Sequence, residues 1–406
     1  MTSVAERLAE WAVALDPSPG DVALAERALL DTVAVATAAR EHPIRDLLGD
    51  LPEAAAWSAL AHVLDFDDLH MESTAHVSAV CVPATLAARG DARAYLAGAG
   101  AMARLGVALG WPHYAAGWHA TCTAGAPAAA VAAAAAMGLD AERIAAAMAL
   151  AVPAAGGVQR AFGTSAKSLQ VGFATDAGVR AARLAAAGAT ADPTALDQWL
   201  GVVGGAAGRL DTSGRAVPGG LAIKLFPCCY ALQRPIAAMQ QLAAIPAGRV
   251  RRIAVRTPAG TLQPLIHSRP ATGLEGKFSL EYALAAALLD GRPGFASFED
   301  DAVLRPDARR LVERVAVSPT PGGEGLLDGT TALEVELDDG TRESAELDLP
   351  PGAPARPPSR AELEAKVADC AGELATEVVA LTWGDAPAFL RDEVAGYPAT
   401  RSASRG

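Results

Sequence analysis

The sequence predicts a mainly α-helical protein with two domains, a large all-helical domain and a smaller α/β domain. Three observations carry this prediction. The chain has 406 residues, which is more than a domain with a single hydrophobic core usually contains. Up to about residue 245 the apolar residues recur with a helical period. After Pro246 they alternate with polar residues, as they do in half-buried strands.

Runs rich in Ala and Leu, separated by Pro and Gly, predict the helices of the first domain. Several runs are apolar on every face, so other helices must cover them. The most apolar stretch, Ala124–Leu139, is too short and too rich in alanine for a membrane span and is expected to be a buried helix. The predicted helices are Val22–Ala39, Ala54–Leu64, Val80–Arg89, Ala92–Gly110, Gly125–Met137, Ala141–Val152 and Phe173–Ala187.

The second domain combines strands and helices. Two strands are predicted at Val250–Thr257 and Ala332–Leu337, and Asp339-Gly340 predicts the turn of a hairpin whose second strand lies within Thr341–Leu349. Helices are predicted at Leu280–Leu289, which Ser279 opens, at Asp307–Val315, and from the capping box Ser359–Glu362 to Leu381. The predicted domains are 1–224 with 385–406 for the helical domain, and 225–384 for the α/β domain.

Composition excludes several classes of protein. The formal charge is −12 and no basic block occurs, which argues against a nucleic acid partner. The five cysteines show no CxxC spacing, so they are expected to be reduced thiols rather than zinc ligands or a disulfide framework. The N-terminus has charges within its apolar pattern and does not resemble a signal peptide, so a cytoplasmic location without membrane contact is expected.

The densest polar cluster follows an apolar helix. Burying such groups without partners costs several kcal/mol each, so a functional site explains the cluster economically. The alternative is a charged, solvated loop without a function. The polar cluster consists of Asp65, Asp67, Asp68, His70, Glu72 and His76.

Three further segments combine polar chemistry with an apolar setting. His119 and Thr121 directly precede an Ala-rich helix, whose N-terminus favours an anion, although a lone histidine beside Trp118 is also typical of a core. The chain contains only four lysines, and Lys167 and Lys224 lie in apolar, turn-rich segments. Such lysines indicate compact cations for a substrate, with an ordinary surface lysine as the alternative.

Two histidines, several carboxylates and two isolated lysines are the groups needed to abstract a proton next to a carboxylate. Two other functions use similar residues. Asp67, Asp68 and Glu72 could bind magnesium diphosphate, as in terpenoid synthases, but the chain contains no Asn for the second metal motif of those enzymes and has only 5% aromatic residues. His70 and His76 could bind a transition metal, but a spacing of six does not place them on one helical face.

The chain resembles the MmgE/PrpD family, which includes 2-methylcitrate dehydratase, cis-aconitate decarboxylase and iminodisuccinate epimerase. The segments that carry the resemblance follow the family's order from residue 60 to 370 and so cover most of the chain. They are Leu64–Asp68 with His76–Ser78, Gly117–Thr121, Ser165–Gly172, Lys224–Cys229, Gly273–Tyr282 and Ala361–Lys366.

The resemblance implies a site between a helical domain and an α/β lid, a homodimer, and no metal or organic cofactor. It also implies roles for individual residues. Lys167 and Lys224 would bind substrate carboxylates, and Thr121 and Gln170 are expected to bind the substrate with them. His76 and His119 would transfer protons, Asp65 would orient a histidine or take part in the transfer, and Tyr282 would reach in from the lid.

The chain departs from the family pattern at three positions. Leu69 stands where the family usually has Thr, Val77 where it has Pro, and Gln170 where it often has His. We therefore expect a cofactor-independent lyase acting on a small di- or tricarboxylate, with dehydration as the reaction. Decarboxylation of the cis-aconitate type and epimerisation of the iminodisuccinate type remain alternatives, as does a binding protein without catalysis.

Overall fold

A computed structural model describes residues 2–242, 245–321 and 329–396 of the chain. The chain divides into two units. The helical unit comprises Met1–Val158, Ser168–Leu221 and Arg360–Gly406, and the mixed unit comprises Gln159–Lys167 and Ala222–Ser359. Mainly α-helical structure with a smaller α/β part is what the periodicity predicts, and the structure confirms it.

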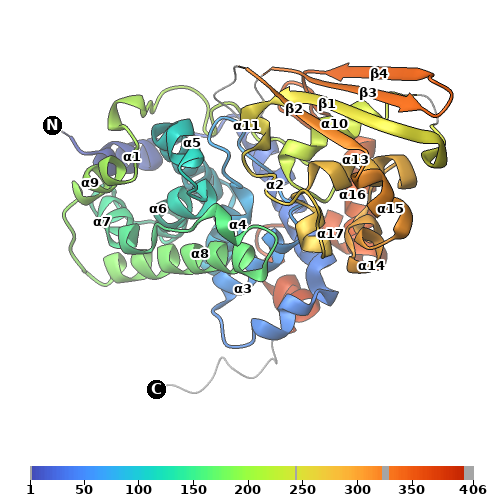
Figure 1. Ribbon diagram of the computed structural model, residues 1–406. Coiled ribbons are helices and arrows are strands. Elements are labelled where there is room, and N and C mark those ends of the chain that lie inside the picture. Colours follow the sequence, from blue (N-terminus) through green and yellow to red (C-terminus); the bar gives the residue numbers. More distant parts are fainter. Residues whose placement is uncertain (1, 243–244, 322–328, 397–406) are drawn as a thin grey trace. The chain divides into compact units, whose positions relative to one another are not determined.

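In the described residues of the first unit, helices joined by loops form the structure (Figure 1). Side-chain caps set several of their starts, since Ser3, Ser18, Asp91 and Asp140 each accept a hydrogen bond from a backbone N–H of the first turn. The helices up to α9 are α1 (Val4–Ala14), α2 (Pro19–Ala38), α3 (Glu53–Val63), α4 (Ser78–Ala87), α5 (Ala92–Ala115), α6 (Ala120–Ala136), α7 (Ala141–Ala151), α8 (Ser165–Ala186) and α9 (Ala195–Val202), with short 3-10 turns η1 (Ala39–Glu41), η2 (Pro43–Leu47), η3 (Val152–Ala154) and η5 (Ala207–Arg209).

Helix α6 lies at the centre of this unit. Every residue from Ala120 to Ala134 is buried, which confirms the predicted buried helix, and α4, α5 and α7 pack around it. Small side chains allow the close packing, because a Cβ on Gly98 of α5 would lie 2.5 Å from the Cβ of Ala132. Within the described residues, no helix is long and apolar enough to cross a membrane.

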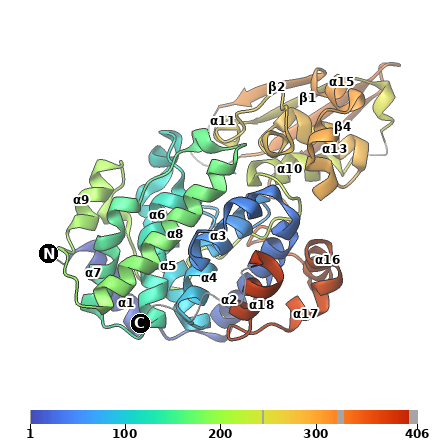
Figure 2. The same ribbon diagram turned by 90° about the horizontal axis from the view of Figure 1, so that it is seen from below.

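The C-terminal helices belong to the helical unit. They are α16 (Arg360–Ala371), α17 (Ala375–Ala380) and α18 (Ala386–Phe389), with η8 (Gly372–Leu374) and the π-helical turn η9 (Leu390–Ala395). Helices α16 and α17 pack against α2, and Figures 1 and 2 show these red helices beside the blue one. The division by contacts thus places residues from 360 onward in the helical unit, whereas the sequence prediction assigns 225–384 to the α/β domain.

The prediction of a single helix from Ser359 to Leu381 is wrong. Gly372 has a φ of +55°, a left-handed conformation that ends α16 before α17 begins.

A four-stranded sheet forms one layer of the mixed unit, in the order β2-β1-β3-β4. Strand β1 (Val250–Pro258) pairs in parallel with β2 (Val315–Thr320) and antiparallel with β3 (Thr331–Leu337), which forms a hairpin with β4 (Arg342–Leu347). Alternate residues of β3, from Thr331 to Leu337, are buried, as the sequence period predicts. The turn predicted at Asp339-Gly340 is confirmed, with a φ of +85° at Gly340.

Helices cover one face of this sheet (Figure 1), and α10 contacts both β3 and β4. Ser279 caps α13, as predicted, by accepting a hydrogen bond from the N–H of Tyr282. The helical elements of this unit are η4 (Gln159–Ala161), α10 (Tyr230–Met239), η6 (Ala247–Arg249), α11 (Ala259–Leu262), α12 (Gly273–Gly276), α13 (Leu280–Asp290), η7 (Phe295–Phe298), α14 (Asp300–Val303) and α15 (Pro306–Val312).

Candidate active site

The polar cluster of the sequence lies in the loop between α3 and α4, and this loop is buried. Asp65 is 2% exposed, Asp67 0%, Asp68 1% and His76 8%, whereas Glu72 is exposed. A solvated, inert loop is therefore the wrong interpretation. Since buried charged groups need partners, the contacts of each one define what the loop can do.

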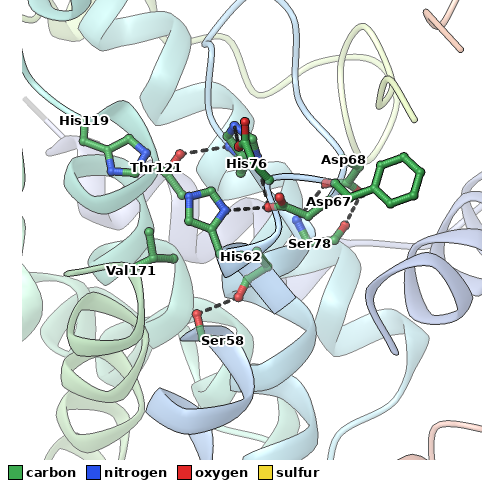
Figure 3. A network of polar contacts seen from close by, with 12 residues as sticks. Ser58, His62, Asp67, Asp68, His76, Ser78, His119, Thr121 and Val171 are labelled. Carbon is green, nitrogen blue, oxygen red and sulfur yellow. Dashed lines mark hydrogen bonds and ion pairs between the residues drawn. The ribbon is translucent and has the colours of Figure 1, made fainter. Parts of the chain in front are cut away.

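Asp67 binds two histidine rings through one oxygen (Figure 3). Its Oδ2 lies 2.8 Å from Nδ1 of His62 and 2.9 Å from Nδ1 of His76. Burial opposes ionisation of Asp67, but the charges and hydrogen bonds of both histidines outweigh it and hold the pKa well below its usual range. An ionised carboxylate only accepts hydrogen bonds, so both rings carry a hydrogen on Nδ1.

His76 presents its other nitrogen toward a second carboxylate. Its Nε2 lies 3.9 Å from Oδ1 of Asp65, and its backbone N–H donates to Oγ1 of Thr121 at 3.1 Å. With Nδ1 carrying the hydrogen, Nε2 holds a lone pair that can accept a proton. The ring lies between two carboxylates. Their negative charges favour the positive charge that the ring gains when it accepts a proton.

Asp65 holds an unusual backbone conformation, with a φ of +55°. Asp tolerates the left-handed region better than most residues, but the conformation still costs energy and persists only where surrounding contacts impose it. One such contact is a hydrogen bond of 2.7 Å from Nζ of Lys366 to the carbonyl of Phe66, the next residue. The directions of the Asp65 and Asp67 side chains thus depend on α16.

His119 lies at the N-terminus of α6, as predicted, and acts as its N-cap residue. Its ring stacks on that of His62, with centroids 5.7 Å apart. Gln170 of α8 reaches it, with Nε2 2.7 Å from Nδ1 of His119. The helical unit therefore brings together Asp65, His76, His119, Thr121 and Gln170 of the predicted residues.

The other three predicted residues belong to the mixed unit. Lys224 is fully buried, and the amide of Gln233 accepts the backbone N–H groups of the next two residues at 3.0 Å each. Lys167 is 5% exposed, and its Nζ lies 5.6 and 5.4 Å from the ring centroids of Phe162 and Phe278. Tyr282 donates to the carbonyl of Ser297, and burial raises its pKa to about 12.

His62 belongs to the site, but the sequence reasoning missed it. It ends an apolar helix and is wholly buried, five residues before Asp67. Its position, about one helical turn before an Asp-rich segment, is the feature of the sequence that indicates a contact with those carboxylates.

His70, in contrast, lies outside the site. Its Nδ1 lies 2.8 Å from Oγ of Ser73 and its Nε2 lies 2.7 Å from the carbonyl of Pro218. Both nitrogens are engaged, so the hypothesis of a metal held by His70 and His76 is wrong.

The magnesium hypothesis fails for a similar reason. Asp67 binds histidines, Asp68 binds Ser78, and Glu72 is exposed, so the three carboxylates do not converge. A different set does converge: one atom each from His62, Asp65, Asp67 and His76 lies within 4.8 Å of the others. Imidazole and carboxylate suit zinc, iron or manganese, so independence of metal stays a prediction.

Asp68 points away from the histidines and contacts the start of α4. Its Oδ1 accepts the N–H of Ser78 at 3.0 Å, its Oδ2 accepts the Ser78 hydroxyl, and that hydroxyl lies 2.8 Å from the hydroxyl of Tyr95. Burial, and next the charge of Asp31, raise the pKa of Asp68 to about 7.

The raised pKa of Asp68 predicts that stability falls with rising pH. The neutral carboxyl is favoured in the folded chain, so its contribution is complete below about pH 4 and is lost as the pH rises through 7. We expect this group to lower the free energy of unfolding by about 1 kcal/mol between pH 6 and pH 8. Asp68→Asn keeps the contacts with Ser78. In this variant the fall in the free energy of unfolding between pH 6 and pH 8 should be absent. All six tryptophans lie in the helical unit, so fluorescence during urea unfolding reports on it, and an identical pH dependence in both proteins would contradict the prediction.

Profiles of a known protein family match most of the chain. The profile described as MmgE/PrpD N-terminal domain matches residues 49–209, and the profile described as MmgE/PrpD C-terminal domain matches residues 226–382. The chain belongs to the MmgE/PrpD family. The first match contains the buried loop, His119, Lys167 and Gln170, and the second contains Tyr282, whereas Lys224 lies between the two matched ranges.

Several relatives within the MmgE/PrpD family carry the same name. A cis-aconitate decarboxylase of Aspergillus terreus (strain NIH 2624 / FGSC A1156) is 26% identical over 353 residues, which is 75% of this chain and 71% of that protein. The cis-aconitate decarboxylase of Mus musculus is 26% identical over 61% of this chain and 54% of its own length. That of Homo sapiens is 26% identical over 50% of this chain and 45% of its own. The prediction of a lyase agrees with these names, because a decarboxylase is a carboxy-lyase.

The departures from the MmgE/PrpD pattern differ in their setting. Leu69 is 1% exposed and Val77 is wholly buried, so both are part of the apolar core around the loop. Gln170, in contrast, contacts the ring of His119. This departure therefore changes the polar contacts of the site.

Proposed function

We propose that this chain is a lyase that acts on a small tricarboxylate and forms negative charge on a carbon next to a carboxylate. The observation that carries the proposal is the buried Asp67–His76 pair beside Asp65. A carboxylate that fixes the hydrogen on one ring nitrogen leaves the other as a general base. The names of the relatives, all cis-aconitate decarboxylases, support a tricarboxylate substrate.

In a dehydration, Nε2 of His76 takes the proton from the carbon next to a carboxylate. The electron pair of the broken C–H bond delocalises into that carboxylate as an enediolate and then forms the double bond as hydroxide leaves and is protonated to water. The enediolate is the state that the site must stabilise most strongly, because only interactions stronger there than in the substrate accelerate the reaction.

In a decarboxylation, the bond to a carboxyl carbon breaks instead, carbon dioxide leaves, and the electron pair stays on carbon until a proton quenches it. The relatives favour this second outcome, and the imidazolium of His76 is then the proton donor. The ring of His76 is the base in the dehydration and, already protonated, the acid in the decarboxylation. Both reactions build negative charge on carbon, and they differ in the group that leaves.

Substrate carboxylates need cations. The resemblance assigns this role to Lys167 and Lys224, and it implies that Tyr282 is a catalytic residue. Their burial, at 5%, 0% and 0% exposure, supports a role other than surface solvation. Independence of metals and organic cofactors, and a homodimeric assembly, complete the proposal.

Proton NMR in deuterated buffer tests the reaction class. The purified protein is incubated with citrate, 2-methylcitrate, cis-aconitate, malate or iminodisuccinate, with a chelator in half of the samples. We expect a new alkene signal or deuterium incorporation that survives chelation. Loss of activity with chelator would transfer the chemistry to a metal held by His62, Asp65, Asp67 and His76. No change in any substrate would contradict the proposal.

Lys224→Met should weaken catalysis strongly. Methionine preserves the length of the buried side chain and removes its charge. The variant therefore loses the cation that binds a substrate carboxylate while negative charge develops in the transition state. We expect kcat/KM to fall between about 30-fold and about 1,000-fold, or about 2 to 4 kcal/mol. Arg256→Met, which removes a charge from an exposed position of β1 in the same unit, is the matched control. Equal rates for the two variants would remove Lys224 from the mechanism.

A further inference from the structure

The amide of Gln170 has only one orientation that satisfies its surroundings. Its Oε1 accepts the backbone N–H of Val158 at 3.2 Å, and its Nε2 donates to the backbone carbonyl of the same residue at 3.3 Å. A backbone N–H can only donate and a carbonyl can only accept. The NH₂ group must therefore face the ring of His119, whose Nδ1 lies 2.7 Å away.

The backbone that orients the amide is itself held in place. Val158 forms an antiparallel bridge with Trp118, and the N–H of His119 donates to the carbonyl of Gly157 at 3.0 Å. Gly157 has a φ of +115°, and a Cβ there would lie 2.7 Å from that of Cys122. Glycine is thus required where the two segments meet, and the 157–158 segment is a rigid template for the amide.

Because the Gln170 NH₂ group donates to it, Nδ1 of His119 is an acceptor. The neutral ring then carries its hydrogen on Nε2. This is the reverse of His76, whose Nδ1 hydrogen faces Asp67. Cys122, with Sγ 3.3 Å from the same Nδ1, is compatible with this arrangement, since a thiol is a weak donor.

We infer that Gln170 is a positioning residue that holds His119 as a neutral hydrogen-bond donor through Nε2, which acts on the oxygen where negative charge develops. This inference rests on the proposed function and divides its work between the two histidines. His76 transfers the proton, and His119 stabilises the enediolate oxygen without changing its own charge. A neutral imidazole can serve in this way, because its N–H polarises an oxygen without proton transfer.

The resemblance implies that His119 transfers protons, and the contact with Gln170 argues otherwise. A proton taken up by the neutral ring would enter at Nδ1 and would there face the NH₂ group of Gln170. Two donors cannot share a hydrogen bond, so protonation costs the ring this contact. The residue that departs from the family pattern therefore determines which role His119 has in this chain.

Ring nitrogen shifts measured by NMR test the assignment directly. The full chain is labelled with ¹⁵N in histidine, and the signals of His119 are identified by their loss in His119→Gln. We expect Nδ1 without and Nε2 with an attached hydrogen in the wild type. Gln170→Glu replaces the donor by an acceptor and should place a hydrogen on Nδ1. Gln170→Met removes the donor and should give a mixture of both tautomers.

Kinetics supply the second readout. We expect Gln170→Glu to lower kcat about 100-fold with little change in KM, because the donor acts on charge that develops in the transition state. Gln198→Glu, an added charge at an exposed position of α9, should leave the shifts and the rate unchanged. A hydrogen on Nδ1 in the wild type, or wild-type shifts in Gln170→Glu, would overturn the inference. The shifts are measured without substrate, so they decide the role of Gln170 even if the panel of acids shows no reaction.

Discussion

Asp67→Asn is expected to reduce kcat about 10,000-fold while leaving the protein folded. The asparagine fits the same space, but its NH₂ group can donate to Nδ1 of His76 and so move the hydrogen of the ring to Nε2. The lone pair that should accept the substrate proton is then lost. The orienting aspartate of a serine protease triad shows an effect of this size when it is changed to asparagine.

The neighbouring residue provides a matched control. Asp68→Asn makes the same substitution one position further along, where the contacts of the carboxyl are with Ser78 and not with a ring. We expect it to retain most of the activity. Near-equal rates for the two variants would show that Asp67 acts as a general buried charge and not by orienting His76. His76→Asn should match the loss in Asp67→Asn, because both variants remove the same base.

Lys366→Met is expected to destabilise the helical unit by about 3 to 5 kcal/mol, the usual cost of leaving one buried charge without its partner. Nζ of Lys366 lies 2.6 Å from Oδ1 of Asp31, and both side chains are 1% exposed. The ammonium group also donates to the carbonyl of Phe66 and lies 4.0 Å from the centroid of its ring. Urea unfolding, followed by tryptophan fluorescence, measures the loss.

A double variant separates the buried charge from the contact with the loop. Lys366→Met with Asp31→Leu replaces the ion pair by apolar groups and should recover most of the stability. The Phe66 carbonyl stays without its donor in that variant, so kcat should remain reduced although the fold is restored. Full recovery of both quantities would show that the hydrogen bond to Phe66 has no effect on the site.

The elements of the fold follow from local sequence. Apolar periodicity places the helices of the first unit and the strands β1 and β3, and Asp339-Gly340 and Ser279 mark a turn and a helix start. These features depend on residues close together in the chain, where spacing and backbone preference act directly. The polar cluster at 65–76 was likewise visible, because its charges interrupt an apolar pattern.

The partners of those charges could not be read from the sequence. Lys366 lies 300 residues from the carbonyl it binds, and Gln170 lies 51 residues from His119. His62 contacts Asp67 and belongs to the site although it lies outside the polar cluster of the sequence. His70 lies within that cluster but contacts Ser73 and Pro218 instead.

The sequence by itself determined the fold class and the family of this protein and the residue types available for chemistry. Only the tertiary structure decided which ring nitrogen carries the hydrogen in His76 and in His119. A tautomer depends on the direction of one donor or acceptor, here Asp67 for His76 and the amide of Gln170 for His119. That direction is set by packing between segments far apart in the chain, and a pattern along the chain does not contain it.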